Sequence, residues 1–361
     1  DLLWRSIVWA ARKPFVLQGM PPMLGMRIDD VWGTWRETQP ENPLYWVDIA
    51  NRFGIKPWLG VFQDNVNDAT LIQIQKHTKN GTATAFPHAF AGCEWVASDL
   101  PEHFIYFDHF AKKPYSDAQM AENAARAKGW FDAQGIPISK FAVGHYYETG
   151  RNAIPYFEQW GCEFIASHME PGTSYLSQKD WITGGPYRLT EKMALSAPRP
   201  VFYADQLPGS TLFNCVVEIR DVCDYEWAPN CNVARTVKNG ITQVRRAFDS
   251  MAPATLFTHE SAYIQRMSPN TWEASLAGIT DAVRSYAPET LTMDDICCYV
   301  RARYQIKIAC TEVDADGKLR LTLTGTNDLA TKCYVFEESN STIRQSLATL
   351  PRVSGQATVT L

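Results

Sequence analysis

Two adjacent carboxylates close a strongly apolar stretch near the start of the chain. The stretch covers residues 22–33, opens with prolines, ends with glycine and contains Asp29 and Asp30. An apolar run of this kind predicts a strand buried in a sheet that is covered on both faces. Because successive side chains of a strand point to opposite faces, both carboxylates reach one site only if the strand ends there and turns.

Two carboxylates at the end of a buried strand are costly unless a metal, another cation or a proton lies between them. The structural alternative is a helix N-cap or an Asx turn after the strand. The histidines favour the metal, because His88, His145, His168 and His259 each close a later candidate strand. By contrast, we expect His77 and His103 to be surface residues.

These residue types suit metal-assisted hydrolysis. A catalytic Zn²⁺ site takes three protein ligands from histidine and carboxylate and keeps one position for water. A second carboxylate can accept the proton of that water, and a histidine on the other side can protonate a leaving amine. The residues supply each part: Asp30 as ligand, Asp29 as base, two histidines as ligands and His259 as acid.

The elements that would position these residues alternate between strand and helix. Apolar segments predict strands over 22–33, 54–62, 82–88, 139–145, 162–168, 199–205 and 252–259, three of which follow a helix that ends at a Gly-Ile or Gly-Cys junction. Helices are expected over 2–14, 41–53, 66–79, 117–133, 152–160, 233–250 and 270–286. With no Gly-x-Gly-x-x-Gly segment, this α/β pattern favours a distorted (β/α)7-type barrel, whose active site gathers at the carboxyl ends of the strands.

The pattern changes at about residue 300. Short alternating strands are expected at 306–308, 319–323, 333–336 and 357–361, with Asp-Gly and Asn-Asp turns between them. We therefore divide the chain into a barrel over residues 1–300 and a small antiparallel β module, sandwich-like, over 301–361. We assign the module a packing role.

Composition excludes some functions and gives a weak indication of compartment. The net charge of -5 provides no general attraction for nucleic acid, and no apolar run approaches the roughly 20 residues needed to cross a bilayer. Nine cysteines leave one disulfide plausible among Cys215, Cys223 and Cys231. We expect a secreted or periplasmic protein, and the oligomeric state is left open.

The constellation resembles the polysaccharide deacetylase (NodB-like) superfamily of metal-dependent amidases and esterases. The matching segments are Arg27-Ile28-Asp29-Asp30, Leu256-Phe257-Thr258-His259 and, between them, Phe141 to Glu148; the resemblance covers about residues 20–290. It implies a deacetylase barrel acting on an amino-sugar polymer with a divalent metal, Zn²⁺ being expected. It also implies Asp29 as base, Asp30 as metal ligand and His259 as acid.

The sequence departs from the family at the metal histidines, which normally lie four residues apart. His88 is followed by Gly92 where the second histidine is expected. We take His109 as its replacement, with the segment 93–106 inserted between the two halves of the motif. His145 is the competing third ligand and is otherwise a substrate or oxyanion contact.

Substrate-binding residues are expected beside this site, namely Trp32, His145, Tyr146 and Glu148. Glu148 has an equally good structural explanation as an acid at a helix N-terminus. Two other functions stay open. One is a glycoside hydrolase that pairs Asp29 with Glu148 or Asp205, and the other is a carbohydrate-binding barrel that has lost its metal.

Overall fold

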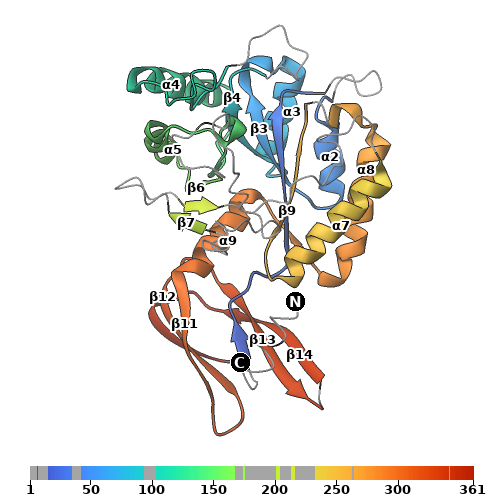
Figure 1. Cartoon of the computed structure of the whole chain (residues 1–361), viewed down its shortest axis with the longest axis vertical. Helices are drawn as coiled ribbons and strands as arrows, with labels where there is room; N and C mark the ends of the chain where they lie inside the picture. The colour runs from blue at the N-terminus through green and yellow to red at the C-terminus, as the bar shows by residue number, and fades with distance from the viewer. Residues whose placement is uncertain are drawn as a thin grey trace.

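The computed structural model describes residues 6, 15–34, 42–92, 103–166, 174, 201–203, 213–215, 232–261, 264–340 and 342–361. Its central element is β2 (Met23–Val31), in which all nine residues are buried. β3 (Pro57–Phe62) and β9 (Ala254–His259) pair with β2 in parallel. β4 (Thr84–Ala89) pairs with β3, and β10 (Glu289–Thr290) pairs with the start of β2, again in parallel (Figure 1).

A second sheet continues the arc. β5 (Phe141–Ala142), β6 (Phe164–Ile165) and β8 (Phe213–Cys215) pair in parallel, and a parallel bridge from Ala85 to Ile138 joins β4 to the segment before β5. These pairings confirm a parallel α/β architecture, while closure into a barrel stays a prediction. The expectation of one more parallel strand at 199–205 is wrong, because β7 (Val201–Tyr203) runs antiparallel to β8.

Helices cover the strands. α2, α7 and α8 lie together on one side of the parallel sheet, whereas α4 and α5 lie on the other side of the molecule (Figure 1). Side-chain caps fix several helix starts; Ser116 accepts from the Gln119 N–H and Ser268 accepts from the Thr271 N–H. The helix bounds are α2 Tyr45–Arg52, α3 Asp68–Lys79, α4 Asp117–Ala133, α5 Ile154–Gln159, α7 Val233–Asp249, α8 Pro269–Val283 and α9 Met293–Gln305.

The core has two parts, one on each face of β2. Leu24, Met26 and Ile28 belong to a cluster that includes apolar residues of α2 and α8. On the other face, a Cβ added at Gly25 would lie 2.7 Å from Ile296 of α9, which belongs to the second cluster. Arg27 and Asp29 share the parity of Gly25 along the strand, so they face the inside of the sheet.

The C-terminal part contains two three-stranded antiparallel sheets. One is built from β11 (Ile306–Val313), β12 (Leu319–Thr326) and β15 (Ser354–Thr360), and the other from β1 (Phe15–Leu17), β13 (Thr331–Ser339) and β14 (Thr342–Leu350). Apolar residues of the two sheets form one small core. The antiparallel strands expected past residue 300 are therefore confirmed, although β14 was not foreseen.

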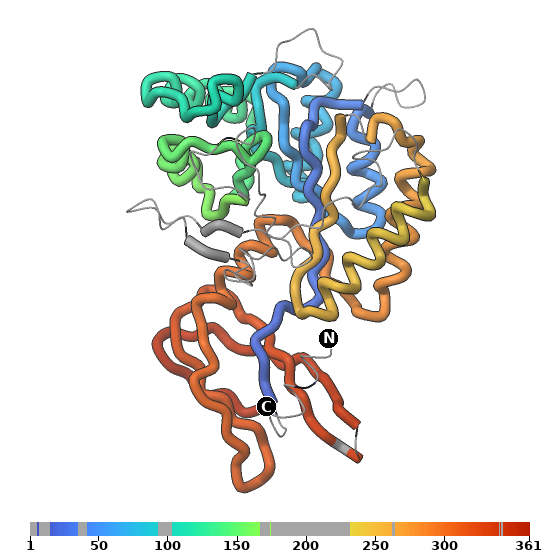
Figure 2. Tube along the Cα trace, in the orientation of Figure 1, coloured from blue at the N-terminus to red at the C-terminus, as the bar shows by residue number. Residues whose placement is uncertain are grey.

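Two details differ from a division at residue 300. β1 comes from the start of the chain, yet it pairs with β13 of the C-terminal sheet. α9 crosses residue 300 and leads directly from the parallel part into β11, as the continuous trace in Figure 2 shows. The helix expected at 2–14 and the disulfide expected among Cys215, Cys223 and Cys231 lie largely outside the described residues.

Candidate metal centre

A β-bulge brings Asp29 and Asp30 to the same site. The register between β2 and β3 shifts between Ile28 and Val31, and Asp30 has a left-handed φ of 56°. Strand alternation predicted that the strand ends here, but β2 continues to Val31 with a local irregularity in its backbone. A bulge changes the direction of a side chain without ending the strand pairing. For this reason the two adjacent carboxylates do not point to opposite faces of the sheet.

His88 reaches the site through a second bulge. Val61 pairs with Pro87 and Phe62 pairs with Ala89, so His88 is the extra residue of β4. Gly60 of β3 leaves room for its ring, since a Cβ there would lie 3.0 Å from His88 Cγ. The Nδ1–H of His88 donates to the Val143 carbonyl at 2.8 Å. This bond directs the Nε2 lone pair towards the carboxylates, as is usual for a histidine that binds a metal.

Three buried atoms have the mutual spacing that a metal requires. His88 Nε2 lies 3.7 Å from Asp30 Oδ1, His145 Nδ1 lies 3.4 Å from Asp30 Oδ1, and the two ring nitrogens are 3.3 Å apart. Ligands about 2.1 Å from a tetrahedral metal stand roughly 3.4 Å from one another. In the described part of the chain, Asp30, His88 and His145 are the group that meets this test.

The donor set also leaves a buried oxygen that a cation would satisfy. Asp30 Oδ2 accepts a hydrogen bond from the Ser261 hydroxyl at 2.9 Å. Asp30 Oδ1 is shut off from solvent, and none of its contacts with described residues has hydrogen-bond geometry. Leaving such an oxygen unsatisfied is costly, so the residues fit a divalent cation bound at this position.

Electrostatics keep the two carboxylates charged and His88 neutral. Burial alone would raise the pKa of Asp30, but His259 and His145 hold that pKa below its ordinary value. Burial lowers the pKa of His88 to about 4, against the opposing effect of Asp29. At neutral pH the group therefore presents an anionic oxygen and a neutral imidazole, the protonation states in which these side chains bind metals.

Asp29 is held next to the candidate ligands by Arg27. The Arg27 guanidinium donates from Nε to Asp29 Oδ1 at 2.7 Å and from Nη2 to Asp29 Oδ2. Burial would raise the pKa of Asp29, but Arg27 and His88 lower it overall. Asp29 Oδ2 lies 3.5 Å from His88 Nε2, so this carboxylate borders the metal position.

Arg27 is itself fixed from several sides. Its guanidinium lies over the rings of Trp58, Tyr147 and Phe257, at 5.7, 4.9 and 4.6 Å from their centroids. The Tyr147 hydroxyl also accepts from Arg27 Nη1 at 3.3 Å. Because the carboxylate is bound to a rigid, fully buried cation, its position is well defined.

His259 lies beside Asp29 at the same edge of the sheet, since the two residues are register partners in β9 and β2. The residue after it, Glu260, is fully buried and accepts four hydrogen bonds at 2.7–2.8 Å. The donors are the Trp32 and Gly33 N–H groups, the Thr34 hydroxyl and the Trp46 indole N–H. Glu260 thus ties the exit of β2 to the end of β9.

Glu260 and Ser261 were not among the residues predicted from the sequence. Both directly follow His259, in a polar run at the end of a strand, and this was the available signal. The Glu260 carboxylate is buried at the N–H groups after β2, and burial raises its pKa although all four donors oppose the shift. Glu260 and Ser261 together fix the position of Asp30 relative to His259.

His109 lies outside the group of three candidate ligands. Its Nδ1 is 2.8 Å from Glu148 Oε2, and its ring is nearly parallel to the neighbouring rings of Phe104 and Tyr146. Glu148 is buried and its other oxygen accepts from the Ser174 hydroxyl at 3.0 Å. We therefore replace His109 by His145 as the third candidate ligand. Glu148 follows a short 3₁₀ helix (His145–Tyr147) instead of starting a helix.

The remaining expected residues lie as follows. Trp32 packs on Phe62, whose ring stacks on that of His88, and Tyr146 contacts His145 with ring centroids 4.3 Å apart. Both candidate substrate contacts are thus next to the group. The surface position expected for His77 is wrong, because its side chain is buried and hydrogen-bonded to Thr82. His168 and Asp205 lie outside the described residues.

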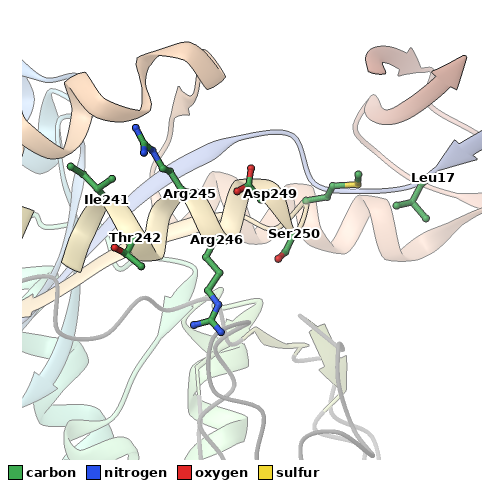
Figure 3. A pocket seen from close by; sticks show the side chains of 8 residues that line it. Leu17, Ile241, Thr242, Arg245, Arg246, Asp249 and Ser250 are labelled. Atoms are coloured by element: carbon green, nitrogen blue, oxygen red, sulfur yellow. The ribbon is translucent and has the colours of Figure 1, made fainter. Parts of the chain in front are cut away.

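A separate cavity of about 770 Å³ lies beside α7, and Figure 3 shows the side chains that line it. It is formed by the second half of α7 and by the segment that leads into β2, and therefore lies towards the amino ends of β2 and β9. Its lining residues are Leu17, Ile241, Thr242, Arg245, Arg246, Asp249, Ser250 and Met251. None of these is a candidate ligand of the metal centre.

Comparisons with known proteins are sparse. No family model matches the chain, and no curated protein matches it. Among solved structures, the chain is similar to a "putative polysaccharide deacetylase from Mycobacterium smegmatis", with 11% identity and a TM-score of 0.49. The match covers 81% of this chain and 94% of the other. Similarity at this level carries no argument about activity.

Proposed function

We propose that this protein is a metal-dependent hydrolase that removes N-acetyl groups from an amino-sugar oligosaccharide or polysaccharide. The observation that carries the proposal is the spacing of Asp30 Oδ1, His88 Nε2 and His145 Nδ1, which are 3.3–3.7 Å apart around a buried, unsatisfied oxygen. The motif resemblance of Arg27 to Asp30 and of Leu256 to His259 supports the same chemistry.

The three side chains would hold a divalent cation, for which zinc fits the mixed oxygen and nitrogen donor set. When bound, such an ion lowers the pKa of a water molecule and polarises a carbonyl oxygen. The chain's own contribution is to keep Asp30 ionised and His88 neutral and to orient both through Ser261 and the Val143 carbonyl.

Asp29 and His259 would perform the proton transfers. Asp29 is ionised, fixed by Arg27 and next to the candidate ligands, so it is placed to accept a proton from an attacking water. His259 lies on the neighbouring strand in register with Asp29 and is partly exposed, so it is placed to donate a proton to the leaving nitrogen. The two groups thus have separate roles at one edge of the sheet.

The glycoside hydrolase alternative receives less support from the described residues. The Glu148 carboxylate is hydrogen-bonded to His109 and Ser174, and the Asp29 carboxylate is hydrogen-bonded to Arg27. A pair of carboxylates for sugar cleavage needs one protonated acid facing the substrate. Neither side chain shows that arrangement.

The decisive experiment combines metal analysis with an acetate-release assay on N-acetylated oligosaccharides. We expect about one divalent metal per chain, loss of acetate release after chelation and recovery on adding Zn²⁺. Asp29→Asn should keep the metal and lose at least about 100-fold in kcat, because it removes the general base but no ligand. New reducing ends in place of acetate would exclude a deacetylase, and full acetate release without metal would exclude the metal-dependent mechanism.

A further inference from the structure

A tight turn beside the metal centre displays an exposed aromatic ring. Asp108 and Lys113 pair through two backbone hydrogen bonds of 3.0 and 3.2 Å, and the Asp108 carboxylate accepts from the Ala111 N–H at 2.9 Å. Within this turn Phe110 is 65% exposed, more than any other large apolar side chain in the described part of the protein. The turn therefore holds an apolar ring in solvent, although exposing apolar surface to water is unfavourable.

The exposed ring is close to the candidate ligands. Phe110 contacts Phe104 with centroids 5.9 Å apart, and Phe104 contacts His145 at 5.4 Å. Phe110 also contacts His109 edge-on at 5.4 Å. Phe110 is thus linked through the ring of Phe104 to His145, one of the three candidate ligands.

His109 adds a fixed polar atom to this surface. Glu148 accepts from Nδ1 at 2.8 Å, and the flanking rings of Phe104 and Tyr146 lie within 20° of the imidazole plane. Because Glu148 engages Nδ1, Nε2 is the ring nitrogen that remains for a ligand. In the described structure, the bond to Glu148 is the hydrogen bond that the His109 side chain makes. A ligand hydroxyl group, which can both donate and accept, is a suitable partner for Nε2.

The surroundings of Phe110 favour a small ring over a protein partner. The residues that follow it are Ala111, Lys112 and Lys113, all exposed, so the apolar patch consists of a single ring. Protein interfaces require contiguous apolar patches of several hundred Å². A sugar needs less: an apolar ring face for its C–H groups and a few placed polar atoms for its hydroxyls.

We propose that Phe110, together with His109 and Glu148, forms a sugar-binding subsite for the unit next to the one that loses its acetyl group. The inference rests on the proposed function and extends it to the substrate class. The substrate is an oligosaccharide or polymer, and a free monosaccharide is processed poorly. Glu148 is here a positioning residue, which acts through His109.

The test compares N-acetylglucosamine with its oligomers of two to five units. We expect kcat/KM of the unaltered protein to rise at least 10-fold from the monomer to the oligomers. Phe110→Ala should abolish this rise through KM and leave the monomer rate, the metal content and the melting temperature unchanged. His109→Gln should raise KM for oligomers in the same way. Ile72→Ala, which removes a side chain 60% exposed on α3, is the matched control and should change nothing.

Direct binding separates this inference from the proposed function. Calorimetric titration with the pentamer is carried out on the unaltered protein, Phe110→Ala and Ile72→Ala. If no acetate is released but Phe110→Ala binds the pentamer at least 10-fold more weakly, the deacetylase assignment fails and the subsite stands. If acetate is released but Phe110→Ala behaves as Ile72→Ala does in both assays, the subsite is overturned. Absence of pentamer binding to the unaltered protein overturns it as well.

Discussion

Two buried carboxylates, Asp30 and Glu260, lie at the ends of neighbouring strands and differ in how completely their oxygens are hydrogen-bonded. Both Glu260 oxygens are saturated by four donors at 2.7–2.8 Å. Asp30 has one oxygen bonded to Ser261 and one that faces two imidazole nitrogens without a hydrogen bond among the described residues. A saturated buried carboxylate stabilises the fold, whereas a half-satisfied one is a place for a cation.

The comparison also shows how one carboxylate depends on the other. Glu260 binds the backbone N–H groups of Trp32 and Gly33 directly after β2, and Trp32 is only two residues from the left-handed Asp30. A non-glycine residue with positive φ costs roughly 1–3 kcal/mol and persists only when its surroundings enforce it. The structural carboxylate thus supports the strained conformation of the candidate ligand.

The largest effect should follow from Asp30→Asn. The substitution replaces the anionic candidate ligand by a weak neutral one. We expect the protein to lose its stoichiometric metal and its activity to fall at least about 1,000-fold. The unfolding free energy of the metal-free protein should stay the same or rise, because a buried charge is removed. Metal analysis and denaturant unfolding with chelator present measure the two effects. If the variant keeps its metal, the ion is bound at another site.

Glu260→Gln should give the reverse pattern. An amide presents donors to groups that already donate, so we expect a loss of about 2–4 kcal/mol in unfolding free energy, with or without metal. Denaturant unfolding of both forms measures this loss. If stability is unchanged while metal affinity collapses, Glu260 belongs to the metal centre and the contrast with Asp30 disappears.

The pH dependence of stability should identify the neutral imidazole. The pKa of His88 is about 4 in the folded protein and 6.5 when unperturbed, so the unfolded chain binds its proton first as the pH falls. Stability of the metal-free protein is therefore lost between pH 6.5 and 4, by up to about 3 kcal/mol from this residue. His88→Asn should flatten the curve in that interval. Identical slopes for the two proteins would show that His88 is not responsible.

The smallest effect should come from Gly60→Ala. The added methyl would lie 3.0 Å from His88 Cγ and 2.9 Å from Trp58, so the imidazole must shift by a few tenths of an ångström. We expect metal affinity to fall about 10-fold, because ligand distances are tightly set. Gly129→Ala on α4 is the control; its Cβ meets nothing within 4 Å, and it should leave metal affinity unchanged. If the two variants bind the metal with equal affinity, Gly60 does not contribute to positioning His88.

The sequence predicted the regular parts of the fold well for identifiable reasons. The helix expected at 117–133 has those bounds in the structure, since Ser116 caps it and Gly135 follows it. The strands that became β2, β3, β4 and β9 are apolar runs between helices with clear ends. β5 and β6 were foreseen as longer strands, and each contains only two residues.

The site was harder to predict, because its geometry depends on exceptions to strand alternation. Asp29, Asp30 and His88 were identified from their positions at strand ends. For the third candidate ligand, His145 was kept only as the alternative to His109, because it reaches the site through a 3₁₀ turn in which Tyr146 and Tyr147 have positive φ. No residue-type pattern encodes two consecutive left-handed tyrosines, so sequence spacing favoured His109 instead.

The pairing of β1 with β13 has a consequence for how the chain is synthesised. The Tyr334 hydroxyl donates to the Met20 carbonyl across 314 residues, next to the strand pair. Residues 15–17 therefore wait for their partner strand until residues 331–339 have left the ribosome. Until then the first segment is an unpaired edge that chaperones or neighbouring chains can engage.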